Sequence, residues 1–374
     1  MGKSNSNMST ARKAKNDEFY TRLEDIEKEL RYYKKHFNNK VVFCNCDDPY
    51  ESNFFKYFAL NFNRLGLKKL ISTCYAGSDE IPLFDDGNGG LRKALKAVII
   101  IDEVYDINGD GAVDEDDIKL MLHKPGVVTE LKGNGSFDSP ECIELLKQSD
   151  IVCTNPPFSL FRDFVYTMVK YDKKFLIIGN MNAITYKEIF PLIKDNKMWV
   201  GYNFNQSMVY RTPYENNLDA NRKFVKSKGC NPDENYIKVS AVCWFTNLEH
   251  AKRNEEMFLI KEYIGNESSY PKYNNYDAIN VDKIDDIPCD YDGVMGVPIT
   301  FLGKYCPEQF DIIGCADSDI VPENWGGMSS EFVKDYYEQG NTGSYKEGNR
   351  LAHYYNNGKC IIPFKRILIK PKRK

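Results

Sequence analysis

The chain has 374 residues, of which 42% are hydrophobic and 28% are charged, and its formal net charge at pH 7 is −4. This length allows one large α/β domain with a smaller one, and the composition is typical of soluble globular proteins. No apolar run approaches the roughly 20 residues of a membrane-spanning helix, and the first residues lack the apolar core of a secretory signal. We therefore expect neither a membrane-spanning protein nor a secreted one.

Cysteine usage and charge distribution narrow the class further. The 11 cysteines are irregularly spaced and none belongs to a C-x-x-C pair, which indicates reduced thiols and a cytoplasmic location. Both ends of the chain are basic, at residues 1–16 and 365–374, while much of the acidity lies in residues 102–117. Such ends are either solvated tails or nucleic-acid contacts. The charge permits nucleic-acid binding without requiring it.

The predicted elements alternate along the chain as in a doubly wound α/β fold. Helices are predicted at 22–37, 51–65, 140–148 and 159–170, and strands at 41–43, 69–75, 127–130, 150–154, 175–178, 198–200 and 239–245. Phe54, Phe55, Phe58 and Phe62 recur at helical spacing and are predicted to be core residues. The alternation predicts a seven-strand Rossmann-like core in residues 1–250, with an insertion at 76–126. Residues 251–374 form a separate C-terminal region.

A proline-rich loop follows one of these strands. Asn155, Pro156, Pro157 and Phe158 come directly after the apolar run that ends at Thr154. A buried strand that ends in such a loop places rigid polar groups at the carboxyl edge of a sheet, where open α/β folds bind ligands. The alternative is a turn with an N-capping asparagine.

The residue types of this loop suit the binding of a planar amino group. The side-chain oxygen of Asn155 and the carbonyl oxygen of Pro156 can each accept one hydrogen from an exocyclic amine. Because accepting both hydrogens localises the nitrogen lone pair, the amine becomes a better nucleophile. Pro156 and Pro157 restrict the backbone torsions so that the acceptors are aimed in advance. Phe158 offers a ring for base stacking, worth roughly 1–3 kcal/mol per base.

These residues resemble a known family signature. Asn155–Phe158 is similar to the signature of amino-group methyltransferases that use S-adenosylmethionine. With the stretches at 17–21, 41–49, 52–58, 149–162, 171–178, 265–272 and 293–302, the chain resembles the EcoRI-type adenine-specific DNA methyltransferase family. The likeness fails mainly at 76–126 and in parts of 203–236 and 316–350. It implies an adenine-N6 methyltransferase acting on a flipped-out base in duplex DNA, with residues 251–374 as the target-recognition region.

The same resemblance implies a set of cofactor-binding residues. The usual glycine loop after the first strand is absent, and Asn45, Asp47, Asp48 and Pro49 stand in its place. Either aspartate suits the ammonium of the methionine moiety, although Asp48 is equally suited to cap the next helix. The remaining candidates are Phe19, Tyr20 and Thr21 for the methionine end, Asp79 or Glu80 after the second strand for the ribose hydroxyls, and Asn134 and Ser136 for the adenine.

One segment predicts a different chemistry. Residues 106–117 follow the spacing of an EF-hand calcium loop and resemble dockerin-type loops, with oxygen ligands at Asp106, Asn108, Asp110, Asp114 and Asp117. Asp117 stands where a glutamate is usual. The alternatives are a structural calcium ion bound in this loop and an acidic turn that binds no metal.

Two classes of function follow. The first is a DNA adenine methyltransferase, with RNA or a protein amide as alternative substrates, because the loop suits any planar amino group. The second is a calcium-binding docking module, which accounts only for residues 106–117. For the enzyme we expect a monomer with a companion restriction endonuclease. Trp244 or Phe245, and the aromatic and amide residues of 266–276, are further candidates for contact with the target DNA.

Overall fold

The computed structural model describes residues 20–46, 52–75, 83–85, 91–93, 96–133, 135–211, 219–234, 236–316, 326–348, 350–354 and 357–372. Its chain divides into two compact units, one formed by Met1–Met181 with Gly201–Leu248 and the other by Asn182–Val200 with Glu249–Lys374. In the described residues, no helix is long and apolar enough to cross a membrane.

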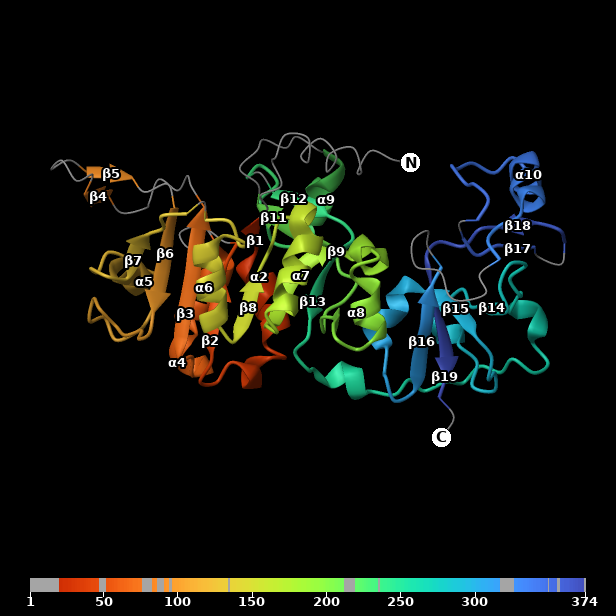
Figure 1. Cartoon of the computed structure of the whole chain (residues 1–374), viewed down its shortest axis with the longest axis horizontal. Helices are drawn as coiled ribbons and strands as arrows, with labels where there is room; N and C mark the ends of the chain where they lie inside the picture. Colours follow the sequence, from red (N-terminus) through yellow and green to blue (C-terminus); the bar gives the residue numbers. More distant parts are fainter. Residues whose placement is uncertain are drawn as a thin grey trace. The chain divides into compact units, whose positions relative to one another are not determined.

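A mixed β-sheet forms the centre of the first unit (Figure 1). Its strands in this unit are β2 (Val41–Cys44), β3 (Lys69–Tyr75), β6 (Lys96–Ile101), β7 (Val128–Glu130), β8 (Ile151–Thr154), β9 (Lys174–Asn180) and β13 (Val242–Thr246). They lie in the order β13-β9-β8-β2-β3-β6-β7. The four strands β9, β8, β2 and β3 are parallel, whereas β13 and β6 run antiparallel to their neighbours. The predicted α/β fold is confirmed.

In the described residues the large sheet has eight strands rather than the predicted seven, and β10 (Trp199–Val200) is counted in it as well. β6 was not counted among the seven, and the predicted strand at 198–200 corresponds to β10, which belongs to the second unit. The strand predicted at 239–245 is also wrong in part, because Ala241 takes the left-handed backbone conformation at φ 60°. This turn separates β12 (Tyr236–Val239) from β13, and the two strands belong to different sheets.

The order of the parallel strands creates a topological switch point between β2 and β8. The chain leaves β2 toward β3 on one side, and β8 pairs with β2 on the other side. At such a point the connections diverge from the carboxyl ends of two adjacent strands, which leaves a crevice where α/β proteins bind ligands. Asn45 directly follows β2 and Asn155 directly follows β8. The fold therefore places the two predicted loops side by side.

The helices of the first unit cover this sheet, except α9 (Asp219–Ser227), which packs against β12 (Figure 1). They are α2 (Leu23–Leu30), η1 (Lys34–His36), α3 (Asn53–Leu60), α4 (Phe62–Leu65), α5 (Glu115–Leu122), α6 (Pro140–Gln148), η2 (Phe158–Leu160), α7 (Phe161–Lys170) and α9, and η3 (Met181–Thr185) follows β9. Ser52 caps α3 through its hydroxyl, which accepts a hydrogen bond from the Phe54 backbone N–H at 3.1 Å. Phe54, Phe55, Phe58 and Phe62 are buried, as the spacing predicts.

A small antiparallel sheet completes the first unit. It consists of β1 (Tyr20–Thr21), β11 (Met208–Arg211) and β12, in the order β1-β11-β12. A separate hairpin pairs β4 (Leu83–Asp85) with β5 (Leu91–Lys93). Since β1 contains two of the predicted cofactor residues, the small sheet links the segment 208–239 to the expected site.

The second unit is built on a different sheet, in the order β14-β15-β19-β16. These strands are β14 (Ile279–Asn280), β15 (Met295–Pro298), β16 (Phe310–Cys315) and β19 (Arg366–Pro371), and the hairpin β17 (His353–Tyr354) with β18 (Cys360–Ile361) lies apart from them. The helices are α8 (Phe190–Lys194), α10 (Ser330–Glu338), η4 (Ala251–Asn254), η5 (Glu267–Ser269), η6 (Ile284–Asp286) and η7 (Ile299–Lys304).

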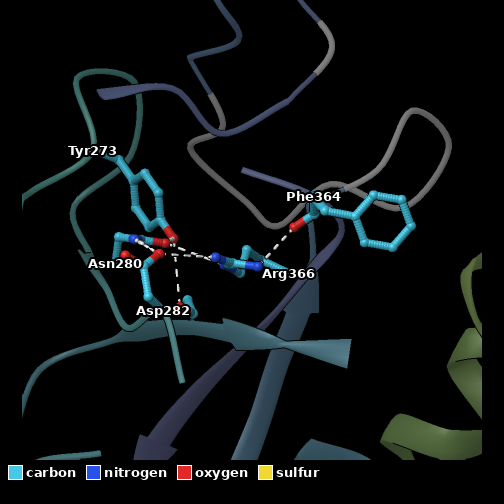
Figure 2. A network of polar contacts seen from close by, with 6 residues as sticks. Tyr273, Asn280, Asp282, Phe364 and Arg366 are labelled. Carbon is cyan, nitrogen blue, oxygen red and sulfur yellow. Dashed lines mark hydrogen bonds and ion pairs between the residues drawn. The ribbon is translucent and has the colours of Figure 1, made fainter. Parts of the chain in front are cut away.

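A buried polar network organises this second unit (Figure 2). The guanidinium of Arg366 donates to Asn280 Oδ1 at 3.1 Å and to Asp282 Oδ1 at 3.2 Å, and the Tyr273 hydroxyl donates to Asn280 Oδ1 at 2.7 Å. Tyr270 and Tyr273 are each only 6% exposed. Of the candidates for DNA contact in 266–276, these two tyrosines are therefore core residues in this structure. The assignment of residues 251–374 to target recognition stays a prediction.

Candidate active site

The predicted catalytic loop lies at the carboxyl end of β8, as expected. Asn155 is half-buried and follows Thr154, which is fully buried. Pro157 has φ −53° and precedes η2, which leads directly into α7. The loop is therefore held between a buried strand and a helix. Phe158 is only 8% exposed and belongs to the hydrophobic core, so little of its ring is available for stacking in this conformation.

A hydrogen bond joins the loop after β2 to the end of β8. The backbone N–H of Cys46 donates to the Thr154 hydroxyl at 3.2 Å. Asn45, next to Cys46, is 3% exposed, and its side-chain Nδ2 has no hydrogen-bond partner among the described residues. A buried amide donor without a partner is costly unless a ligand accepts from it. The site thus places one such donor beside the Asn155 loop.

The segment around β1 reaches the same edge of the sheet. The side-chain Nδ2 of Asn53, at the start of α3, donates to the Thr21 carbonyl at 2.7 Å. Thr21 is 4% exposed, and its hydroxyl has no hydrogen-bond partner within the described part of the chain. Thr21 therefore lies beside the start of α3. The Thr21 hydroxyl and the Asn45 side-chain amide are thus buried at one end of the sheet with no hydrogen-bond partner among the described residues. This arrangement suits the binding of a polar ligand.

The remaining predicted cofactor residues are only partly placed. Phe19, Asp47, Asp48, Pro49, Asp79 and Asn134 lie outside the described residues, as does Glu80. Tyr20 is described only as the backbone of β1. Ser136 is half-buried, and its hydroxyl donates to Asp138 in the loop before α6. Glu141 on α6 accepts from the backbone N–H groups of Lys132 and Gly133 and so holds the preceding loop.

The structure gives no support to calcium in the acidic loop. Asp106 accepts from the backbone N–H groups of Gly109 at 2.6 Å and Gly111 at 2.8 Å, and Asn108 accepts from Asp110. Asp114 and Asp117 form a capping box at the start of α5. In the part of the chain that the structure describes, no group of three or more histidine, cysteine or acidic side chains could hold a metal ion. The side-chain oxygens act as backbone acceptors that shape the turn.

Two further candidates for target contact are core residues. Trp244 is 1% exposed and Phe245 is completely buried, so neither contacts a target base in this structure. Trp244 packs edge-on against Phe54 with ring centroids 5.7 Å apart. Every side chain of β13 is buried, because both faces of this strand are covered. The alternation of residues along the strand therefore could not show whether either ring faces a ligand.

The structural role of Gly179, which lies behind the catalytic loop, was not identified from the sequence. At Gly179 on β9, a Cβ atom would lie 2.4 Å from the ring of Phe161, the first residue of α7. Phe161 also packs against Phe245, with ring centroids 5.0 Å apart. The absence of a side chain at Gly179 therefore lets α7, and with it the Asn155 loop, approach the sheet.

Gly179→Ala is expected to destabilise the protein by about 1–3 kcal/mol, because the added methyl group overpacks the Phe161 ring. Urea unfolding of both proteins measures this difference. In the Phe161→Leu background, which removes the ring, the same alanine should cost much less. An equal cost in both backgrounds would contradict the proposed steric cause.

Comparison with known proteins shows that the chain matches one family. Residues 7–372 match a family model described as "Adenine-specific methyltransferase EcoRI". The chain is 45% identical over 364 residues to the type II methyltransferase M.EcoRI of Escherichia coli, covering 97% of this chain and 95% of that protein. It is 43% identical over 310 residues to the type II methyltransferase M.MpnI of Mycoplasma pneumoniae, covering 82% and 84%.

A third relative agrees with the first two. The type II methyltransferase M.MgeORF184P of Mycoplasma genitalium is 40% identical over 309 residues, covering 82% of this chain and 84% of that protein. No solved structure matches the chain significantly. The similarity extends over both units, and it includes the loop after β2 and the loop after β8.

Proposed function

The chain belongs to the EcoRI family of adenine-specific methyltransferases and is a DNA adenine methyltransferase, and on this premise we propose how its residues perform the reaction. The enzyme methylates the N6 amine of an adenine that is flipped out of duplex DNA, since this atom must leave the base stack for in-line attack. S-Adenosylmethionine, the donor that the family uses, supplies an electrophilic methyl group.

Asn155 and Pro156 bind the target amine. The Asn155 side-chain oxygen and the Pro156 carbonyl oxygen accept the two amine hydrogens, which turns the nitrogen lone pair toward the methyl group. The observation that carries this assignment is the position of the loop, at the switch point beside Asn45. Pro157 keeps the acceptors aimed through its fixed φ. Phe158 is the proposed stacking ring for the base, and this role requires more of its ring to be accessible than the 8% exposed here.

The crevice beside the loop after β2 would hold the cofactor. Thr21 and Asn45 supply the buried hydroxyl and amide described above, which suit the polar methionine end. Their neighbours Phe19, Tyr20, Asp47, Asp48 and Pro49 complete that end of the site. Asp79 or Glu80 would bind the ribose hydroxyls, and Asn134 and Ser136 would bind the adenine of the cofactor.

Thr21→Val tests this arrangement, because the two side chains have the same shape. Removing a hydroxyl whose partner is the cofactor should weaken S-adenosylmethionine binding about 5–13-fold, the loss of roughly 1–1.5 kcal/mol. The protein without cofactor should become more stable by about 1 kcal/mol, since a buried polar group without a partner is removed. Calorimetric titration and thermal unfolding measure the two effects.

Thr246→Val is the matched control for this experiment. Thr246 is fully buried, but its hydroxyl donates to the Phe175 carbonyl at 2.7 Å and accepts from Leu248 at 3.0 Å. This variant should lose stability and bind the cofactor normally. If Thr21→Val instead destabilised the protein and left cofactor affinity unchanged, Thr21 would be a structural residue only.

The partners follow from the same proposal. The substrate is duplex DNA, the enzyme acts in the cytoplasm as a monomer, and residues 251–374 recognise the target sequence. A companion restriction endonuclease cleaves the same sequence when it is unmethylated. The support is the type II designation that the relatives carry.

Methyl transfer to different acceptors tests the proposed substrate. The wild-type protein is incubated with S-adenosylmethionine labelled in its methyl group and with duplex DNA, RNA or protein. We expect label in duplex DNA alone, recovered as N6-methyladenine after digestion to nucleosides. Label in RNA, in a protein amide or in cytosine would overturn the substrate assignment.

A further inference from the structure

We propose that four lysines, two on α9, one directly after it and one on β12, form a surface that binds the phosphates of the DNA duplex beside the active site. This basic surface consists of Lys223, Lys226, Lys228 and Lys238, and the proposal rests on the DNA substrate proposed above. The net charge of −4 repels DNA overall. A DNA-binding enzyme with this charge therefore needs a local concentration of cations where the duplex lies.

The helix α9 presents these cations to solvent. Val225 is 1% exposed and anchors the helix, whereas Lys223, Lys226 and Lys228 are exposed. Lys223 and Lys226 are separated by three positions and so share one face of the helix. The four lysines of the basic surface form no ion pair with any residue that the structure describes. Their charges thus remain available to an external anion.

The packing around Phe224 holds the basic surface in place. The Lys238 ammonium lies 4.5 Å from the centre of the Phe224 ring, and the Lys228 ammonium lies 5.6 Å from it. Of the nearby acids, Asp233 binds Arg222 at 2.6 Å, and Asp25 lies within electrostatic range of Lys228. The carbonyl of Lys228 accepts from the Arg22 guanidinium at 2.9 Å, which ties the end of α9 to the segment after β1.

The basic surface is connected to the site by the small sheet. β12 pairs with β11, and β11 pairs with β1, whose Thr21 is bound by Asn53 at the start of α3. All of these elements belong to the first unit, and Figure 1 shows α9 and β12 above the edge of the large sheet at which the site lies. A duplex that offers a flipped base to Asn155 passes this edge. The lysines of the basic surface would then contact the phosphate backbone of this duplex.

Contacts between lysines and phosphates should add affinity for DNA without preference for a base sequence. A lysine ammonium contacts a phosphate as a point charge, and such contacts position the duplex but do not distinguish bases. Neutralising them should weaken specific and nonspecific duplexes alike. Each lost phosphate contact should also lower the dependence of binding on salt by about 0.9 in the log–log slope.

The test is Lys223→Gln/Lys226→Gln in the full-length protein, with glutamine chosen because it preserves helix propensity. We expect the Kd for a duplex to rise roughly tenfold at moderate salt, and the salt slope to fall by about 1.8. In methyl-transfer assays the double substitution should raise the KM for DNA and leave kcat nearly unchanged. Binding of S-adenosylmethionine and the unfolding midpoint report whether the variant is folded.

Two matched variants separate this effect from net charge. Lys34→Gln/Lys35→Gln removes the same two charges from exposed positions of η1, before the amino end of β2 and so at the opposite edge of the sheet. Its Kd should stay close to that of the wild-type protein, and Lys223→Arg/Lys226→Arg should also bind normally. If both glutamine pairs weaken binding equally, or neither does, the basic surface is not a phosphate site. If the wild-type protein neither binds nor methylates duplex DNA, the proposed substrate fails first.

Discussion

Asn155→Ala is expected to lower kcat for methyl transfer by about 10²–10³-fold, the usual loss when one preorganised electrostatic contact to a reacting group is removed. The alanine cannot accept a hydrogen from the target amine, so the nitrogen lone pair stays delocalised in the base. The side chain stands at the end of β8 and only half-buried, so its truncation leaves the packing of the sheet intact. Single-turnover methylation of an adenine-containing duplex measures the loss.

The matched variant is Asn155→Asp, which retains the shape of the side chain and its acceptor oxygen. It should keep more activity than the alanine variant, because the lost function is acceptance of a hydrogen bond. Cofactor affinity and DNA affinity should change little in either protein. An alanine variant whose single-turnover rate stays within about threefold of the wild-type rate would remove Asn155 from the reaction.

Glu29→Gln is expected to destabilise the first unit by roughly 2–4 kcal/mol. Glu29 is completely buried, and its carboxylate accepts from the Tyr33 hydroxyl at 2.9 Å, from Tyr202 N–H at 2.6 Å and from Asn203 N–H and Nδ2, both at 2.9 Å. A carboxylate accepts on both oxygens, whereas a glutamine presents an NH₂ group to one pair of these donors. Two buried donors then lose their acceptor.

The network explains why an acid is buried at this position. Burial raises the pKa of Glu29, and the hydrogen bonds from Asn203, Tyr33 and Tyr202 oppose that rise. The carboxylate fastens the segment 201–203 to α2, and this segment leads into β11 of the small sheet. At Gly201 a Cβ atom would lie 2.5 Å from Glu29 Oε1, so the chain passes close against the network.

Glu27→Gln serves as the control for this substitution. Glu27 lies on the same helix but is exposed, and the change should alter the free energy of unfolding by less than about 0.5 kcal/mol. Urea unfolding at neutral pH compares the three proteins. A Glu29→Gln variant as stable as the Glu27→Gln variant would show that the carboxylate is not needed to hold 201–203.

Much of the sheet could be predicted because local patterns determine it. Short apolar runs separated by helical periodicity predicted β2, β3, β8 and β9, and the Asn155 loop was recognised from residue types that are adjacent in the chain. The prediction failed at Ala241, where a single left-handed residue divides one expected strand into two. At 106–117 the ligand spacing left a calcium loop and a metal-free acidic turn as alternatives, and only the structure shows that the side chains accept hydrogen bonds from their own backbone.

The sequence by itself determined the α/β class, the family and the loop that carries the chemistry, since each depends on residues that are neighbours in the chain. Only the tertiary structure decided which distant groups meet. It brought Cys46 to Thr154, Phe161 to Gly179 and Glu29 to Asn203. It also placed α9 and β12, the elements of the basic surface, above the large sheet. The physical reason is that hydrogen bonds, close packing and charge depend on distances in space, which strand order and crossovers set and spacing along the chain does not reveal.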